Sequence, residues 1–163
     1  MSGANAYAAT FAIRAVEPAD FAAWGALRRA LWPDEDGVDD DESLRAASDD
    51  ATGTHALLAF DSAGAAIGFV DLALRRDYVN GTHTSPVGFL EGWYVAPAWR
   101  GRGVGRALLR AAEDWARALG CSEFASDALL DNVVSHAAHR ACGFKETERV
   151  VYFRKPLPAS APS

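Results

Sequence analysis

A glycine-rich turn in front of an amphipathic segment is the feature that most constrains how this chain can fold. Residues 99–105 read Trp-Arg-Gly-Arg-Gly-Val-Gly, and apolar residues then recur at steps of three and four from Val104 to Leu119. This spacing predicts a helix with one face toward a core, which Gly120 would end. Glycines at its start leave backbone N–H groups unobstructed at the positive end of the helix dipole, which suits a pyrophosphate.

Two common phosphate-binding motifs do not fit this turn. A Walker A loop needs a Lys-Ser or Lys-Thr pair after its last glycine, and here Arg106 and Ala107 follow. The dinucleotide fingerprint fails because the third glycine comes too early. We interpret the turn as another kind of anion cradle, and an ordinary glycine turn before a basic helix is the alternative. The cradle residues would be Arg100, Gly101, Arg102, Gly103, Val104, Gly105 and Arg106.

Strand-like and helical patterns alternate along the chain, which predicts an α/β or α+β domain around one sheet. Strands are expected at 11–16, 55–60, 65–74, 87–95, 123–126 and 147–154, and helices at 18–31, 41–51, 104–119 and 131–142. The length of 163 residues predicts a single domain spanning 1–163. Its ordered core would cover about 10–155, between a short flexible N-terminal lead and a flexible tail rich in Pro, Ser and Ala.

Composition argues against several classes of partner. The net charge of −6 disfavours nucleic acid and suits a cationic substrate. No apolar run approaches the ~20 residues that cross a bilayer, and residues 1–10 do not resemble a signal peptide. Cys121 and Cys142 have neither a zinc spacing nor a disulfide framework. We therefore expect a cytoplasmic protein that binds no nucleic acid, membrane or metal.

The run from Arg100 to Gly105 resembles the acyl-coenzyme-A-binding signature of the GNAT superfamily of N-acetyltransferases. Other segments are similar to those of bacterial aminoglycoside 6'-N-acetyltransferases, and the likeness extends over about residues 11–155. The segments that carry it are 31–33, 77–92, 123–127, 139–144 and 146–150. The resemblance implies the GNAT acetyltransferase fold, a mixed and mostly antiparallel sheet that is splayed at the cofactor site and flanked by helices.

The same resemblance implies an activity. Acetyl-coenzyme A would be the co-substrate, and its acetyl group would pass to the 6'-amine of an aminoglycoside by direct attack of the amine, giving antibiotic resistance. Similar enzymes pair through their C-terminal strands, so a homodimer is expected. Two alternatives stay open: acetylation of another amine (a polyamine, an amino acid or a protein N-terminus), and a non-catalytic acyl-coenzyme-A sensor.

Glu91 is the first candidate catalytic residue, because it is a carboxylate within the apolar run 87–95. Burial of a carboxylate is costly unless it is paired or used, and it would raise the pKa of Glu91 toward that of a general base. A structural salt bridge is the alternative. The resemblance makes Asp127, which follows a short strand, a second catalytic group that contacts the substrate amine; a turn or helix cap is the alternative.

The resemblance also places residues around the two substrates. Trp32, Tyr78, Glu91, Asp127 and Glu148 would bind the aminoglycoside, the main chain of Trp93, Tyr94 and Val95 would follow the thioester, and Asn132 would bind the pantetheine arm. The alternatives are core packing for Trp32, pairing with Arg149 for Glu148 and a helix cap for Asn132. His139 stands where many relatives have a tyrosine that protonates the departing thiolate. Either this histidine acts as the acid or the thiolate leaves unaided.

Overall fold

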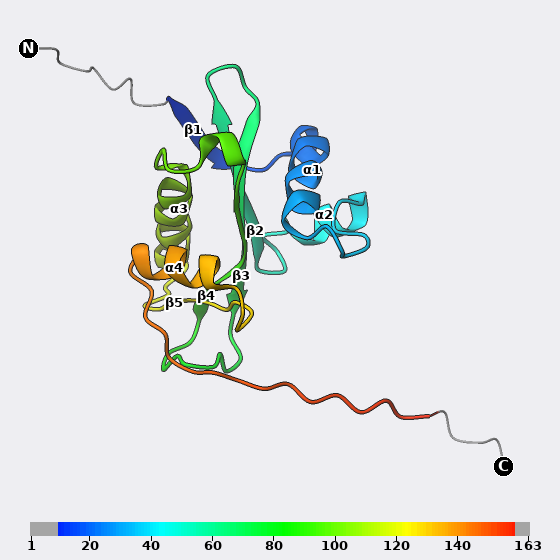
Figure 1. Ribbon diagram of the computed structural model, residues 1–163, viewed down its shortest axis with the longest axis vertical. Coiled ribbons are helices and arrows are strands. Elements are labelled where there is room, and N and C mark those ends of the chain that lie inside the picture. Colours follow the sequence, from blue (N-terminus) through cyan, green and yellow to red (C-terminus); the bar gives the residue numbers. More distant parts are fainter. Residues whose placement is uncertain (1–9, 159–163) are drawn as a thin grey trace, which may run out of the picture.

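Five strands form one mixed sheet, and helices cover both of its faces (Figure 1). The computed structural model describes residues 10–158. The strands lie in the order β1-β2-β3-β4-β5, with all neighbours antiparallel except β4 and β5, which are parallel. The strands are β1 (Phe11–Ala15), β2 (Thr54–Asp61), β3 (Ala66–Arg75), β4 (Val87–Val95) and β5 (Phe124–Ser126). The helices are α1 (Phe21–Leu31), α2 (Asp41–Ala46), α3 (Val104–Ala118) and α4 (Val133–Ala141), with short 3-10 helices η1 (Pro18–Asp20) and η2 (Pro97–Trp99).

This architecture confirms the predicted fold class, a mixed and mostly antiparallel sheet flanked by helices. The first five expected strands form with ends that shift by at most one residue. The expected helix 41–51 stops at Ala46, whose carbonyl accepts a hydrogen bond from Thr54 Oγ1 at 2.6 Å. Helix α4 begins at Val133 because the side chain of Asn132, rather than that of Asp131, caps it.

Alternation along β2 builds a separate core on each face of the sheet. Leu57 packs in the cluster beneath α3, whereas the neighbouring Leu58 packs in the cluster beneath α1. Both side chains are buried, since side chains of successive strand residues point to opposite faces. Trp24 of α1 and Leu108 of α3 are fully buried at the centres of the two clusters. The sheet is therefore held between two helices, which fixes the positions of its strand ends.

Helix α3 begins at the glycine-rich turn, as expected, with Gly103 as its N-cap in the left-handed conformation (φ 85°). Its buried face consists of Val104, Leu108, Leu109, Ala112 and Ala116. Leu119, which the spacing placed on this face, lies at the C-cap and is 44% exposed. The predicted stripe is therefore correct except at its end, where the helix has already stopped at Ala118.

Strands β4 and β5 pair over only three residues and then separate (Figure 1). The last pair is Leu90 with Ser126, whereas β4 runs on to Val95. On its other edge β4 stays paired with β3, but the register shifts so that Leu72 faces Leu90 and Asp71 faces Gly92. Glu91 is thus the additional residue of a β-bulge, a feature that re-aims side chains beside functional sites. The sheet is splayed from this point.

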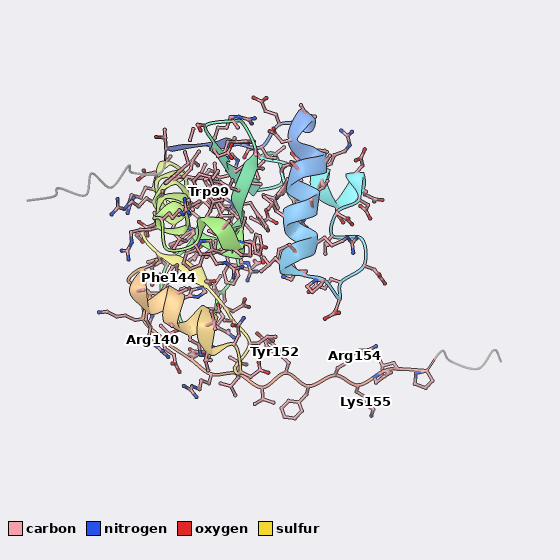
Figure 2. All side chains as sticks on the ribbon, turned by 45° about the horizontal axis from the view of Figure 1, so that its top comes forward. Trp99, Arg140, Phe144, Tyr152, Arg154 and Lys155 are labelled. Atoms are coloured by element: carbon pink, nitrogen blue, oxygen red, sulfur yellow. The ribbon has the colours of Figure 1, made fainter. Side chains whose placement is uncertain are left out.

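The segment after α4 differs most from the expectation. Lys145 and Thr147 still line a cavity with the loop at Gly81, and the chain beyond runs away from the body as an extended arm (Figure 1). The expected strand 147–154 pairs with no other strand within residues 10–158. Figure 2 shows Tyr152, Arg154 and Lys155 along this arm, far from the sheet. Tyr152 is 83% exposed and Phe153 is 93% exposed. A strand needs a neighbour to satisfy its backbone groups, and no strand of the described residues pairs with the arm.

The expected N-terminal lead falls, except for its last residue, on residues 1–9, which lie outside the described residues, as do residues 159–163 of the expected tail. Among the helices of the part that is described, none is long and apolar enough to span a membrane.

Candidate active site

The glycine-rich turn presents an open backbone surface at the start of α3. Gly101 (φ 71°) and Gly103 (φ 85°) both adopt the left-handed conformation that favours glycine, and a Cβ atom built on either would meet nothing within 4 Å. The first N–H groups of a helix have no partner within the helix, so those that follow Gly103 are available to an anion. The turn therefore has the open backbone and the free N–H groups that an anion needs.

The arginines around this turn are partly held by the protein itself. Arg100 Nε donates to the carbonyl oxygen of Val95 at 2.9 Å, and Arg106 Nη2 donates to the carbonyl oxygen of Ala141 at 3.0 Å. The guanidinium of Arg102 lies over the ring of Trp99, 5.4 Å from its centroid. These contacts fix the direction of the side chains and leave further N–H donors on each guanidinium for a phosphate.

The expected thioester strand lies directly against this helix start. In β4, Trp93, Tyr94 and Val95 pair with β3 on one edge only, because β5 has already separated. The indole of Trp93 packs against Gly105, where an added Cβ would lie 3.2 Å from the ring. The β-bulge of this strand lies at Glu91, two residues before Trp93. The open edge of β4 thus begins at the bulge and leads to the glycine-rich turn.

Glu91 is exposed, so the prediction that it is buried is wrong. Its side chain is 42% exposed, and its Oε1 accepts a hydrogen bond from Arg75 Nη2 at 2.7 Å. Gly92 and Leu90 on either side are buried, which shows that the bulge directs only the carboxylate outward. The alternative of a salt bridge is therefore realised, but the carboxylate stays accessible to a cationic substrate. It lines a cavity of about 340 Å³ together with Trp32.

The buried carboxylate of this region is Asp71, which was not among the predicted site residues. Asp71 is 3% exposed, forms an ion pair with Arg28 and accepts a hydrogen bond from Trp24 Nε1 at 3.1 Å. Burial raises its pKa to about 7, and the charge of Glu91 adds to this, against the opposite effects of Arg28 and Trp24. The run Phe69-Val70-Asp71-Leu72 carries the same signal that drew attention to Glu91, a carboxylate among apolar residues.

Arg28 joins this buried carboxylate to the wall of the cavity. Its guanidinium carbon lies 5.2 Å from the ring centroids of both Trp24 and Trp32, and its Nε donates to the carbonyl oxygen of Val38 at 2.6 Å. Trp32 packs edge-on against Phe69 and also lines the cavity. The alternative of core packing is realised for Trp32, whose ring also borders the cavity; its contact with a substrate stays a prediction.

The other expected substrate residues lie on different elements. Asp127 is exposed and directly follows β5, whereas Tyr78 is 77% exposed on the loop before β4. Glu148 is exposed on the C-terminal arm. Asn132 Oδ1 accepts a hydrogen bond from the N–H of Ser135 at 3.0 Å, so its amide NH₂ is the group left for a pantetheine arm. The structure thus brings Trp32 and Glu91 to one cavity, which Tyr78, Asp127 and Glu148 do not line.

Comparisons with known proteins agree with this architecture. Residues 23–144 match the acetyltransferase (GNAT) family. Aminoglycoside N(6')-acetyltransferase type 1 of Stenotrophomonas maltophilia is 58% identical over 149 residues, which cover 91% of this chain and 95% of the relative. The protein of the same name from Acinetobacter baumannii is 48% identical, with 82% and 90% covered.

Solved structures of similar proteins superpose on nearly the whole chain. The crystal structure of aminoglycoside antibiotic 6'-N-acetyltransferase AAC(6')-Ih from Acinetobacter baumannii superposes with a TM-score of 0.84 at 43% identity, covering 91% of this chain and all of that one. AAC(6')-Iy in complex with the bisubstrate analog CoA-S-monomethyl-acetylneamine gives a TM-score of 0.82 at 39% identity, covering 91% and 99%.

The pKa of Asp71 makes stability depend on pH in a definite direction. The folded chain holds a proton on Asp71 up to about pH 7, whereas the unfolded chain releases it near 3.8. The contribution of Asp71 to the free energy of unfolding is fully present below its pKa in the unfolded chain. It is lost as the pH rises through its pKa in the folded chain. The free energy of unfolding of the wild type should therefore fall relative to that of Asp71→Asn between about pH 4 and pH 7. Urea denaturation across this range measures it.

The exposed Asp114, whose side chain is 76% exposed, provides a matched control. Asp114→Asn keeps the buried Asp71, so its free energy of unfolding should fall over this pH range as that of the wild type does. A constant difference between Asp71→Asn and the wild type would contradict the raised pKa.

Proposed function

Because this chain belongs to the acetyltransferase (GNAT) family, we propose that it is an acetyl-coenzyme-A-dependent aminoglycoside 6'-N-acetyltransferase. The observation that carries the proposal is the 58% identity to such an enzyme across 91% of this chain. Acetylation removes one positive charge from the drug, which weakens its attraction to anionic RNA and gives resistance. The chain works in the cytoplasm, where acetyl-coenzyme A is available.

The open edge of β4 and the glycine-rich turn hold the acetyl donor. The N–H groups that follow Gly103 bind its diphosphate, and the backbone of Trp93, Tyr94 and Val95 runs beside its acyl arm. Acetyl-coenzyme A supplies the thioester carbonyl that the amine attacks. A backbone N–H on this edge stabilises the oxyanion that develops there, an interaction worth about 3 kcal/mol in other acyl-transfer enzymes. The reaction uses no metal.

Glu91 receives the 6'-ammonium at the rim of the cavity and accepts its proton, directly or through water. Because Glu91 is exposed and already pairs with Arg75, the ammonium of the substrate can replace the Arg75 guanidinium as its ion partner. Trp32 offers an aromatic wall to the apolar side of a sugar ring. Asp127 and Glu148 hold further ammonium groups of the drug. Acetyl transfer is direct, since burial raises the pKa of the Cys121 thiol and so disfavours the nucleophilic thiolate.

Glu91→Gln tests the role of this carboxylate, because it keeps the size of the side chain and removes its charge. With kanamycin as acceptor, kcat/KM should fall about 100-fold or more, while the Kd for coenzyme A stays within about twofold. Thiol release measures turnover and calorimetry measures binding. The control Asp114→Asn should match the wild type in both.

The same assay separates the alternatives. Turnover with spermidine or a peptide amine but with no aminoglycoside would replace the proposed substrate. Coenzyme A binding without turnover on any amine would indicate a sensor instead of an enzyme.

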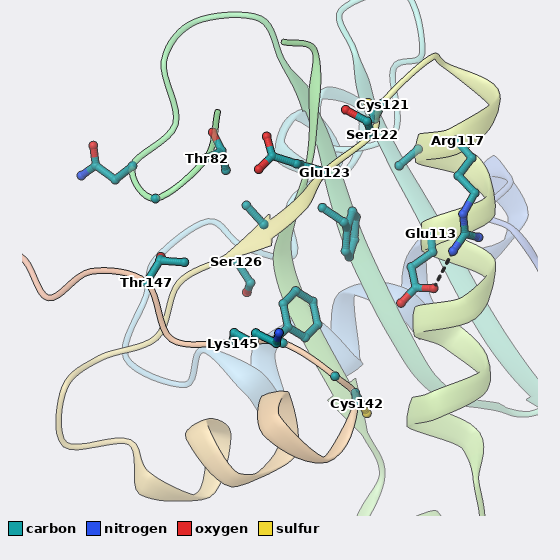
Figure 3. Close-up of a pocket in the computed structure, with 17 residues that line it drawn as sticks. Thr82, Glu113, Arg117, Cys121, Ser122, Glu123, Ser126, Cys142, Lys145 and Thr147 are labelled. Atoms are coloured by element: carbon teal, nitrogen blue, oxygen red, sulfur yellow. Dashed lines mark hydrogen bonds and ion pairs between the residues drawn. The ribbon is translucent and has the colours of Figure 1, made fainter. Parts of the chain in front are cut away.

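We also propose that the chain forms a homodimer through its C-terminal arm. Val150, Val151, Tyr152 and Phe153 give the arm an exposed apolar run. β5 is the last strand of the sheet and has only three residues, and a cavity of about 480 Å³ lies beside it (Figure 3). An arm from a second copy would satisfy the edge of β5 and bury these side chains.

Light scattering of purified protein tests this assembly. The wild type should have the mass of a dimer, and the double variant Val151→Asp/Phe153→Asp should be a monomer, because a charge in a strand interface is costly. Leu119→Asp, at an exposed apolar residue of the body, should stay dimeric. A monomeric wild type, or a double variant that remains dimeric, would contradict the proposal.

A further inference from the structure

Ser126 and His139 form a hydrogen-bonded couple between β5 and α4. Ser126 Oγ lies 2.9 Å from His139 Nε2. The other ring nitrogen, Nδ1, lies 2.7 Å from the carbonyl oxygen of Ser135 and 3.2 Å from its Oγ. A carbonyl oxygen only accepts hydrogen bonds, so Nδ1 carries a proton. In the neutral ring Nε2 is then the acceptor, and Ser126 donates its hydroxyl proton to it.

The couple lies at the apex of the opening between β4 and β5. Ser126 is the last residue of β5 that pairs with β4, and its Oγ is 3.3 Å from the carbonyl oxygen of Leu90, the residue before Glu91. The ring of His139 packs edge-on against Trp93 on the open edge of β4, with centroids 5.6 Å apart. The couple therefore borders the same opening that the acetyl donor occupies in the proposed function, on the side opposite the cavity of Trp32.

The aromatic surroundings orient the histidine. Phe144 packs against the ring with its centroid 5.1 Å away, so two rings and the Ser135 carbonyl fix the plane of the imidazole. Ser126 has two further acceptors, the carbonyl oxygens of Leu90 and Asp127, at 3.3 and 3.4 Å. Both contacts are longer than the one to Nε2, so the imidazole decides where the hydroxyl proton points.

We propose that Ser126 is a catalytic residue that protonates the sulfur of coenzyme A as the carbon–sulfur bond breaks, with His139 as the residue that positions and recharges it. This inference rests on the proposed function. The bonding electrons of the carbon–sulfur bond go to sulfur, and the hydroxyl proton of Ser126 follows them. His139, charged beforehand by a proton at Nε2, donates that proton to Ser126 Oγ. After the transfer both side chains are neutral, and His139 still carries its proton on Nδ1.

The proton balance closes without a further reactant. The ammonium of the acceptor loses two protons on becoming an amide, and the thiol product carries one. The second is released to solvent. His139 takes up one proton for each turnover, and Ser126 passes one on.

Kinetics and binding of three variants test the proposal. Ser126→Ala should lower kcat with kanamycin by about 10- to 100-fold and leave the Kd for coenzyme A within about twofold. Ser126→Thr should restore most of the rate because it restores the hydroxyl. His139→Gln should cost a similar factor, and the double variant Ser126→Ala/His139→Gln should lose little more than either alone, since the two act as a unit. Ser122→Ala, an exposed serine just before β5, is the matched control.

Nitrogen NMR of the imidazole gives a readout that does not depend on activity. In the wild type, the neutral ring of His139 should carry its proton on Nδ1, and Ser126→Ala should move the Nε2 resonance without changing the tautomer. A proton on Nε2 of the neutral ring, or an unchanged kcat in Ser126→Ala, would overturn the proposal. A purely structural role predicts lower thermal stability with unchanged kcat. A wild type that acetylates no aminoglycoside would overturn the proposed function, whatever the NMR shows.

Discussion

Strands β4 and β5 run side by side for three residue pairs, and after Leu90 only β4 continues in the sheet, to Val95. Backbone N–H and C=O groups need partners, so an edge left open inside a domain is a place for a ligand backbone or an extended acyl arm. The open edge leads directly into the glycine-rich turn and α3. Glu91 and Ser126 stand at its apex, on opposite sides of the same strand junction. The end of pairing between β4 and β5 thus positions both Glu91, the proposed proton acceptor, and Ser126, the proposed proton donor.

Two carboxylates near this junction have opposite surroundings. Asp71 is buried with Arg28 and Trp24, and burial raises its pKa to about 7, whereas Glu91 lines the cavity and pairs with Arg75 where solvent reaches it. The buried pair holds Arg28 against Trp32 and so keeps the aromatic wall rigid. A rigid wall with an accessible carboxylate suits a cationic sugar, because ordering the site on binding then costs little. We see the buried Asp71 and its partner Arg28 as structural support, and Glu91 as the group proposed to meet the substrate.

Local patterns predicted most of the fold, and long-range pairing explains what they missed. The apolar spacing and glycines predicted α3 and its first turn, and the apolar run 87–95 predicted β4 to the residue. The exposure of Glu91 could not be predicted, since the bulge depends on the register with β3. The strand expected at 147–154 has the right pattern but no neighbour within the described chain. Likewise the resemblance singled out His139, whereas its contact with Ser126 appears only once β5 and α4 are in place.

The binding of coenzyme A at the helix start is the claim on which the rest depends, and calorimetry of two glycine variants tests it most directly. Gly103 and Gly64 have nearly equal φ values of 85° and 82°, and neither has an atom within 4 Å of an added Cβ, so alanine strains both alike. Gly103→Ala should weaken coenzyme A binding by about tenfold or more, because its Cβ obstructs the N–H groups that face the diphosphate. Gly64→Ala, in the β2–β3 turn, should bind like the wild type. Equal affinity for the two variants would contradict the account.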